Sequence, residues 1–151
     1  MDRSRVSSSD RYYLDSNVII AIVQEPQTLD TARFEFVAKI DAGQLEAVTS
    51  ELALAECLTK PFGEQDQATA DAFLKFLVDR PELPLLPVSP DILLSAARLR
   101  TKSRMKLPDA IHVATAQLAG CSVFLTSDKR VRLPDGLRFG IWQDGSFLRE
   151  G

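Results

Sequence analysis

Four acidic residues stand where apolar segments of the sequence end, or where an apolar helix face would otherwise continue: Asp15, Glu56, Asp109 and Asp128. A carboxylate in apolar surroundings is costly unless it is paired or binds a cation. Ligand sets made only of oxygen select hard cations such as Mg²⁺ or Mn²⁺. A centre with one or two such ions can acidify a bound water and clamp a phosphodiester for in-line attack. The four positions together predict a shared divalent-metal site.

Each of these positions has a more ordinary explanation when it is taken alone. Asp15 would also serve as the N-cap of a following helix, and Glu56 would also reach water from the margin of an apolar stripe. Asp109 suits the positive end of a helix dipole, and Asp128 suits a polar turn. The helix predicted at residues 51–59 contains two glutamates, Glu51 and Glu56. Glu51 lies in the first turn, where the helix dipole favours an acid, so Glu56 is the preferred metal ligand. The hypothesis therefore depends on the four acids converging in space.

Two neighbouring polar residues are predicted to support the carboxylates. Asn17 could hydrogen-bond Asp15 and fix its rotamer, as residues behind metal ligands often do. Ser127 precedes Asp128 and could hold a water or a phosphate oxygen. His112 is expected to be a structural residue or to lie at the substrate edge, rather than to bind metal, and a chain with one His and two distant Cys makes zinc a poor candidate.

Composition limits the class of protein. The chain has 151 residues, of which 45% are hydrophobic and 26% charged, as expected for one ordinary domain with a real core. We expect a flexible tail at residues 1–11 and a single domain at residues 12–151. No apolar run is long enough to span a bilayer, and the first residues lack the apolar core of a signal peptide. Cys57 and Cys121 fit buried free thiols, which points to a reducing cytoplasm.

The charge distribution is more informative than the net charge of −3, which argues against a large nonspecific nucleic-acid binder. One basic run, residues 98–106, precedes Asp109, and a second, residues 129–132, follows Asp128. A basic run by itself is more often a solvated surface. Because both runs flank predicted ligands, they favour a site that attracts phosphate around a metal. The candidate substrate-binding residues are Arg104, Lys106, Lys129 and Arg130.

Short apolar runs alternate with amphipathic segments, which predicts an α/β fold with a mostly parallel central sheet. The predicted strands cover residues 12–15, 45–49, 83–88, 122–126 and 137–142. Helices are predicted at residues 17–24, 29–42, 51–59, 65–79, from 90 onward, and at 108–119. Pro61 is expected to end the third of these helices. Because ligands of open parallel sheets bind beyond the carboxyl ends of the strands, the four acids can meet at one edge.

Four segments of the sequence resemble, in order and spacing, the motifs of PIN-domain nucleases, and in particular the VapC-like toxins of type II toxin–antitoxin pairs. They read YLDSNVII at residues 13–20, TSELALAE at 49–56, LPDAIHVATA at 107–116 and LTSD at 125–128. The resemblance implies a three-layer α/β/α sandwich and a ribonuclease that depends on Mg²⁺ or Mn²⁺. It also implies a homodimer and a small cognate antitoxin whose tail enters the active cleft. By position, Asp15, Glu56, Asp109 and Asp128 would be the acidic quartet.

Three other functions remain open on the sequence. An RNA-processing nuclease that is not a toxin would share every motif. A catalytically inactive module that binds nucleic acid or protein would keep the fold and the basic runs but cleave nothing. A phosphatase with Asp15 as nucleophile fits less well, because such enzymes want a second Asp two residues later, where Asn17 stands.

Overall fold

A five-stranded, fully parallel sheet forms the centre of the molecule in the computed structural model, which describes residues 10–145 and 147. In space the strands follow the order β3-β2-β1-β4-β5. Their bounds are β1 (Arg11–Leu14), β2 (Glu46–Ser50), β3 (Leu85–Leu86), β4 (Val123–Thr126) and β5 (Arg138–Ile141). The predicted α/β fold with a parallel sheet is confirmed.

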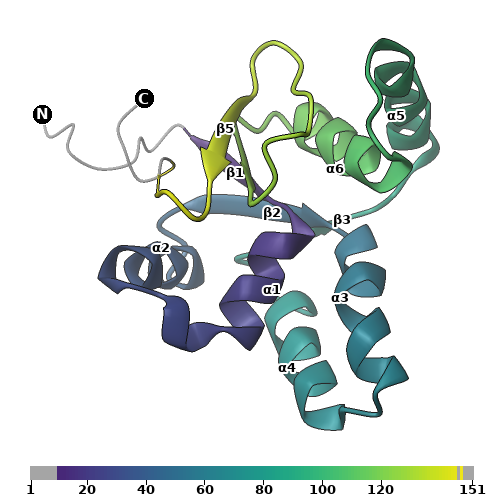
Figure 1. The fold of residues 1–151 in the computed structure, drawn as a ribbon. Coiled ribbons are helices and arrows are strands. Elements are labelled where there is room, and N and C mark those ends of the chain that lie inside the picture. The colour runs from purple at the N-terminus through teal and green to yellow at the C-terminus, as the bar shows by residue number, and fades with distance from the viewer. Residues whose placement is uncertain (1–9, 146, 148–151) are drawn as a thin grey trace, which may run out of the picture.

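Helices cover both faces of this sheet, as Figure 1 shows. Four helices pack on one face, with a short exposed 3₁₀ turn between the first two of them, and two helices pack on the other face. The first set comprises α1 (Ser16–Gln24), η1 (Pro26–Thr28), α2 (Thr31–Asp41), α3 (Leu52–Gly63) and α4 (Gln67–Leu77). The second comprises α5 (Pro90–Lys102) and α6 (Leu107–Leu118). The architecture is therefore the predicted three-layer α/β/α sandwich.

Side chains of the central strand alternate between the two faces, as the period of a β-strand requires. Tyr12 and Leu14 enter the core beneath α1–α4, whereas Tyr13 enters the core beneath α5 and α6. The ring of Tyr13 stacks on that of Phe124 from the neighbouring strand, with 5.4 Å between ring centroids. Burial on both faces holds β1 rigidly, and so fixes the residues that follow it.

The order of the strands creates a crevice beside the end of β1. From β1 the chain moves outward through β2 and β3, and then returns to the other side of β1 with β4 and β5. In open α/β sheets, ligands bind beyond the carboxyl ends of the strands at the place where the strand order reverses, which here lies between β1 and β4. Asp15 follows β1 and Asp128 follows β4, so both carboxylates lie at this crevice.

Most element boundaries differ from the sequence-based expectation by a few residues, and two of these differences concern residues named above. Pro61 does not end α3, which continues to Gly63; Pro61 lies in the last turn, where it removes only one helical hydrogen bond, and it is buried. β1 begins at Arg11, one residue earlier than predicted, and residues 1–9 of the expected tail lie outside the described residues. No helix in the described part of the chain has both the length and the apolar character needed to cross a bilayer.

Candidate metal and active site

Asp15 is held in a single orientation by three donors. It is 5% exposed and caps the N-terminus of α1, where its Oδ1 accepts a hydrogen bond from the backbone N–H of Ser16 at 2.8 Å. Its Oδ2 accepts from Thr126 Oγ1 at 2.7 Å and from Asn17 Nδ2 at 3.3 Å. Donors from β4 and α1 thus satisfy both oxygens of this nearly buried carboxyl group.

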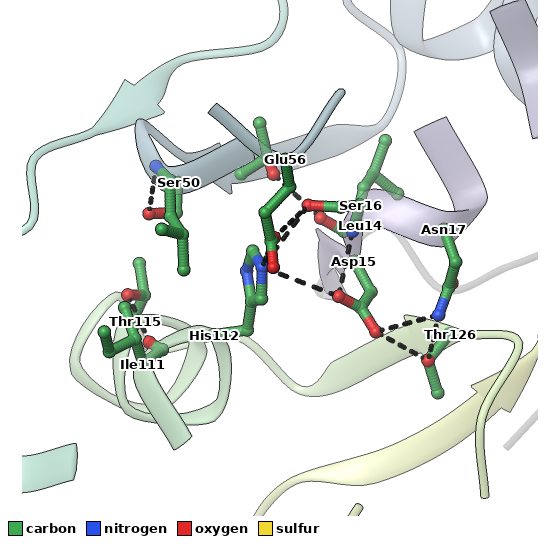
Figure 2. A network of polar contacts seen from close by, with 12 residues as sticks. Leu14, Asp15, Ser16, Asn17, Ser50, Glu56, Ile111, His112, Thr115 and Thr126 are labelled. Carbon is green, nitrogen blue, oxygen red and sulfur yellow. Dashed lines mark hydrogen bonds and ion pairs between the residues drawn. The ribbon is translucent and has the colours of Figure 1, made fainter. Parts of the chain in front are cut away.

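Glu56 reaches the same place from α3 and is bound by two side chains (Figure 2). Ser16 Oγ donates to Glu56 Oε1 at 2.7 Å, and His112 Nε2 lies 2.6 Å from the same oxygen. Burial acts to raise the pKa of Glu56, but the hydrogen bonds from His112 and Ser16 hold it below its ordinary value. Glu56 is therefore ionised at neutral pH, although a third of its side chain remains exposed (32%).

His112 links the two acids to the interior of the protein. The ring is 1% exposed, and its Nδ1 lies 2.6 Å from the hydroxyl of Tyr13. Its Nε2 lies 3.7 Å from Asp15 Oδ1, as well as 2.6 Å from Glu56. Because a carboxylate only accepts, Nε2 must carry the proton that faces Glu56. In the neutral ring Nδ1 is then an acceptor, and Tyr13 donates to it.

Asp109, at the start of α6, and Asp128, just after β4, are the other two predicted ligands. Both line one open cavity of about 660 Å³. Burial raises the pKa of Asp109, and the negative charges of Asp15, Asp128 and Glu56 raise it further. In contrast, hydrogen bonds from Arg130 lower the pKa of Asp128, whose Oδ1 lies 3.0 Å from Arg130 Nε. The charges of the other three acids therefore act on Asp109 in addition to the effect of burial.

The acids provide the right donors for a hard cation, but they do not enclose one in this arrangement. Among residues 10–145 and 147, no three His, Cys, Asp or Glu side chains are gathered closely enough to hold a metal ion. Glu56 is turned toward His112, and Asp128 toward Arg130. A bound divalent cation would offset the repulsion that raises the pKa of Asp109, so the chemistry of the donor set fits Mg²⁺ or Mn²⁺.

The supporting residues differ in part from those suggested by the sequence. Asn17 contacts Asp15 through Nδ2, and its Oδ1 accepts from the backbone N–H of Ser127 at 3.0 Å. Ser127 thus takes part through its main chain. The hydroxyl beside Asp15 and Asp128 belongs to Thr126, which donates to Asp15 and accepts from the backbone N–H of Asp128 at 3.1 Å.

Sequence reasoning missed Thr126, Ser16 and Tyr13 as members of this network. Thr126 and Tyr13 did carry a usable signal, because a hydroxyl within an otherwise apolar buried strand needs a hydrogen-bond partner. Ser16 stands next to Asp15, but its spacing alone does not reveal that its hydroxyl reaches Glu56, 40 residues away in sequence.

The candidate substrate-binding cations separate into two groups. Arg104, Lys106 and Arg130 line the cavity that also contains Asp109 and Asp128. Lys129 is not among the residues that line this cavity, and its Nζ lies 3.9 Å from Asp144 Oδ2. The acidic group therefore borders a cationic cavity, a combination suited to a phosphate chain that approaches a metal centre.

Comparisons with known proteins agree with this fold. Residues 12–137 match the sequence profile of the PIN domain, which covers most of the chain. The chain therefore belongs to the PIN domain family. Comparison with curated protein sequences gives no significant match.

Several solved structures share the fold at low sequence identity. A toxin–antitoxin complex from Klebsiella pneumoniae contains a chain 23% identical, with a TM-score of 0.58 over 83% of this chain and 94% of that one. VapBC2 from Rickettsia felis, bound to a DNA fragment from the promoter, gives 18% identity and a TM-score of 0.64 over 87% and 98%. VapBC-5 from Mycobacterium tuberculosis gives 19% identity and a TM-score of 0.56 over 87% and 98%. These likenesses show a shared architecture.

Proposed function

We propose that this protein is an endoribonuclease that depends on Mg²⁺ or Mn²⁺ and hydrolyses RNA phosphodiester bonds, as the toxin of a type II toxin–antitoxin pair. One observation carries the proposal: Asp109 and Asp128 line one cavity at the sheet of a PIN-family chain, where burial and the charges of Asp15, Asp128 and Glu56 raise the pKa of Asp109. Clustered carboxylates that repel one another are characteristic of a site built for a cation. The adjoining cationic cavity suits an anionic polymer as the substrate.

The residues that would hold the cation are Asp15, Glu56, Asp109 and Asp128. Asp15 presents a fixed carboxylate, whereas Asp128 would have to exchange its contact with Arg130 for the cation. When bound, a divalent cation supplies charge stabilisation for the reacting phosphate and a more acidic water.

The chain's own residues supply orientation and attraction. Thr126, Asn17 and the Ser16 N–H fix Asp15. His112 and the Ser16 hydroxyl orient Glu56. Arg104 and Lys106 would hold the RNA backbone next to the acids, since both line the cavity that contains Asp109 and carry no ion pair within the described part of the chain.

The toxin part of the proposal rests on the structures that share the fold. They come from a toxin–antitoxin complex and from VapBC pairs, so we propose a small cognate antitoxin as partner. We further propose that the protein forms a homodimer and acts in the cytoplasm. An RNA-processing nuclease or an inactive interaction module would share the fold. An antitoxin reading frame beside the gene would favour the toxin.

The experiment is an RNA cleavage assay with purified protein, with Mg²⁺, with Mn²⁺ and with a chelator. We expect cleavage only in the presence of a cation, and its loss in Asp15→Asn and Asp109→Asn with unchanged circular dichroism. Asp71→Asn serves as the matched control, because Asp71 is an exposed carboxylate on α4. Full activity of either site variant would refute the proposal, and binding of RNA without any cleavage would favour the inactive module.

A further inference from the structure

The chain after β5 is tied to the loop that follows β4. The backbone N–H of Trp142 donates to the carbonyl of Thr126 at 2.9 Å. The side-chain amide of Gln143 donates through Nε2 to the carbonyl of Ser127 at 3.1 Å. Two consecutive carbonyl groups of this loop are therefore held by residues 142–143, here called the strap.

One arginine of α2 holds the strap in turn. Arg33 donates to the carbonyl of Trp142 through Nε at 2.9 Å and through Nη2 at 2.6 Å, and Nη2 also donates to the carbonyl of Gln143 at 2.8 Å. Its Nη1 donates to Asp30 Oδ2 at 2.6 Å, and its guanidinium carbon lies 5.7 Å from the centre of the Trp142 ring. A planar guanidinium, with its donors in a fixed fork, is suited to bind two carbonyls at once. Arg33 therefore fixes the direction of two consecutive carbonyls of the strap.

A simpler explanation is that Arg33 only fastens the end of the sheet to α2. Apolar packing already does this, because Trp142 is buried and its ring stacks on that of Phe147, with 5.2 Å between ring centroids. The ring of Phe36 from α2 meets that of Phe147 edge to face, at 4.9 Å. These ring contacts hold the strap against α2 but do not set the direction of its carbonyls. The guanidinium of Arg33, of whose side chain only 13% is exposed, adds that control.

The loop after β4 contacts two of the proposed metal ligands. The hydroxyl of Thr126 donates to Asp15 Oδ2 at 2.7 Å and accepts from the backbone N–H of Asp128 at 3.1 Å. Thr126 is buried, so water cannot readily replace these contacts. A continuous path of hydrogen bonds therefore runs from Arg33, through the peptide groups of Trp142 and Thr126, to both acidic residues.

We propose that Arg33 is a positioning residue of the metal site: it fixes the strap, and the strap holds the loop that orients Asp15 and Asp128. This inference rests on the proposed function and extends it to the residues that set the affinity for the divalent cation. Arg33 is not among the residues that line the cavity of Asp109, so it acts through the strap. Changes to residues that stand behind metal ligands typically alter metal affinity by about 10- to 100-fold.

The test compares Mn²⁺ affinities, measured by electron paramagnetic resonance in the absence of RNA, in the wild type and in Arg33→Lys. Lysine keeps the positive charge but lacks the fork that binds both carbonyls. The matched control is Arg80→Lys, because the Arg80 side chain is 16% exposed, donates to the carbonyl of Phe76 and lies over its ring. Arg80 also pairs with Asp41 and Glu82, and none of its partners belongs to the strap or to the loop after β4.

We expect Mn²⁺ binding to be about tenfold weaker in Arg33→Lys and to stay within about twofold of the wild type in Arg80→Lys. We also expect RNA cleavage by Arg33→Lys to recover as the Mn²⁺ concentration is raised, because the loss lies in metal affinity. Wild-type affinity in Arg33→Lys would overturn the inference. Equal losses in the two arginine variants would also overturn it, since a general loosening of the fold affects both. Cleavage that stays low at saturating Mn²⁺ would do the same.

A milder variant decides the question if Arg33→Lys does not fold. Gln143→Ala removes the exposed amide that donates to Ser127, and we expect Mn²⁺ binding about threefold weaker, the effect of one ordinary hydrogen bond. Its control is Gln67→Ala, which removes an exposed amide that donates to Asp71 within α4. Equal Mn²⁺ affinities in these two variants would overturn the inference.

The wild type separates this inference from the proposed function. If the wild type binds Mn²⁺ and cleaves RNA but Arg33→Lys binds Mn²⁺ as tightly, the positioning role is refuted and the nuclease stands. If Mn²⁺ affinity depends on Arg33 as expected but the wild type cleaves no RNA, the ribonuclease function fails and the positioning role stands. A wild type that binds no Mn²⁺ overturns both.

Discussion

The buried hydrogen bond between Tyr13 and His112 makes a specific prediction about stability and activity. Tyr13→Phe removes the hydroxyl that lies 2.6 Å from His112 Nδ1 and leaves that nitrogen without its donor. Both rings are at most 1% exposed, so water cannot readily replace the lost partner. A buried group left unsatisfied costs about 1–3 kcal/mol. In a chain of this size that corresponds to a fall in Tm of about 2–12 °C.

Tyr13→Phe should also reduce the rate of the proposed RNA cleavage, because His112 orients Glu56. Burial raises the pKa of Tyr13 well above its ordinary value, so the hydroxyl keeps its proton and can donate. Without it the imidazole can rotate or change tautomer, and its Nε2 no longer faces Glu56 in one fixed state. Changes to residues that orient ligands typically cost about 10- to 100-fold in metal affinity or activity.

Tyr12→Phe provides the control within the same strand. Tyr12 is 1% exposed, yet its hydroxyl forms no hydrogen bond with any residue that the structure describes. Chemical denaturation should therefore show a change of less than about 0.5 kcal/mol for Tyr12→Phe. Equal free energies of unfolding for the two variants would refute the reasoning, because the Tyr13–His112 hydrogen bond would then contribute nothing measurable to stability.

Three further changes test other parts of the structure. The pKa of Asp109 is raised by burial and by the neighbouring acids, so its carboxyl group holds a proton more tightly in the folded chain than in the unfolded chain. The unfolding free energy therefore falls as pH rises from the unfolded-state pKa of Asp109 through its folded-state pKa. Asp109→Asn should abolish this fall in denaturation curves recorded across acidic and neutral pH, and stabilise the metal-free protein at neutral pH. Thr126→Val removes the 2.7 Å hydrogen bond to Asp15 and should cost about 1–3 kcal/mol by urea unfolding, with a loss of RNA cleavage. Gly140→Ala would place a methyl group 2.6 Å from a neighbouring β-carbon and should cost about 1–3 kcal/mol, whereas Gly63→Ala meets nothing within 4 Å and should be neutral or stabilising.

The sequence contains enough local information to predict most of the fold. Apolar runs of strand length alternate with amphipathic segments, and this pattern leads to the parallel sheet and its helices. Prolines interrupt the strand predicted at residues 83–88, and they favour a short strand at a sheet edge; β3 is indeed a two-residue edge strand. The prediction that Pro61 ends the helix was wrong. The helix-breaking tendency of proline takes no account of tertiary packing, and burial of Pro61 stabilises the last turn of α3.

The candidate site was predictable only as far as its positions follow from strand and helix ends. Asp15 and Asp128 could be placed at one edge because parallel strands end together. The contacts of His112 could not be derived, since Tyr13 lies 99 positions away in sequence and Glu56 lies 56 positions away. Such contacts depend on the packing of α6 against the sheet, which periodicity does not specify. The role of Thr126 was missed for a similar reason, because its partner comes from the adjacent strand.

The central claim is that the four acids act together as a site for a divalent cation. Titration of the protein with Mn²⁺, followed by electron paramagnetic resonance in the absence of RNA, measures this directly. The account predicts saturable binding by the wild type that is lost or strongly weakened in both Asp15→Asn and Asp109→Asn. Binding of Mn²⁺ with the same affinity and stoichiometry in the wild type and both variants would contradict it.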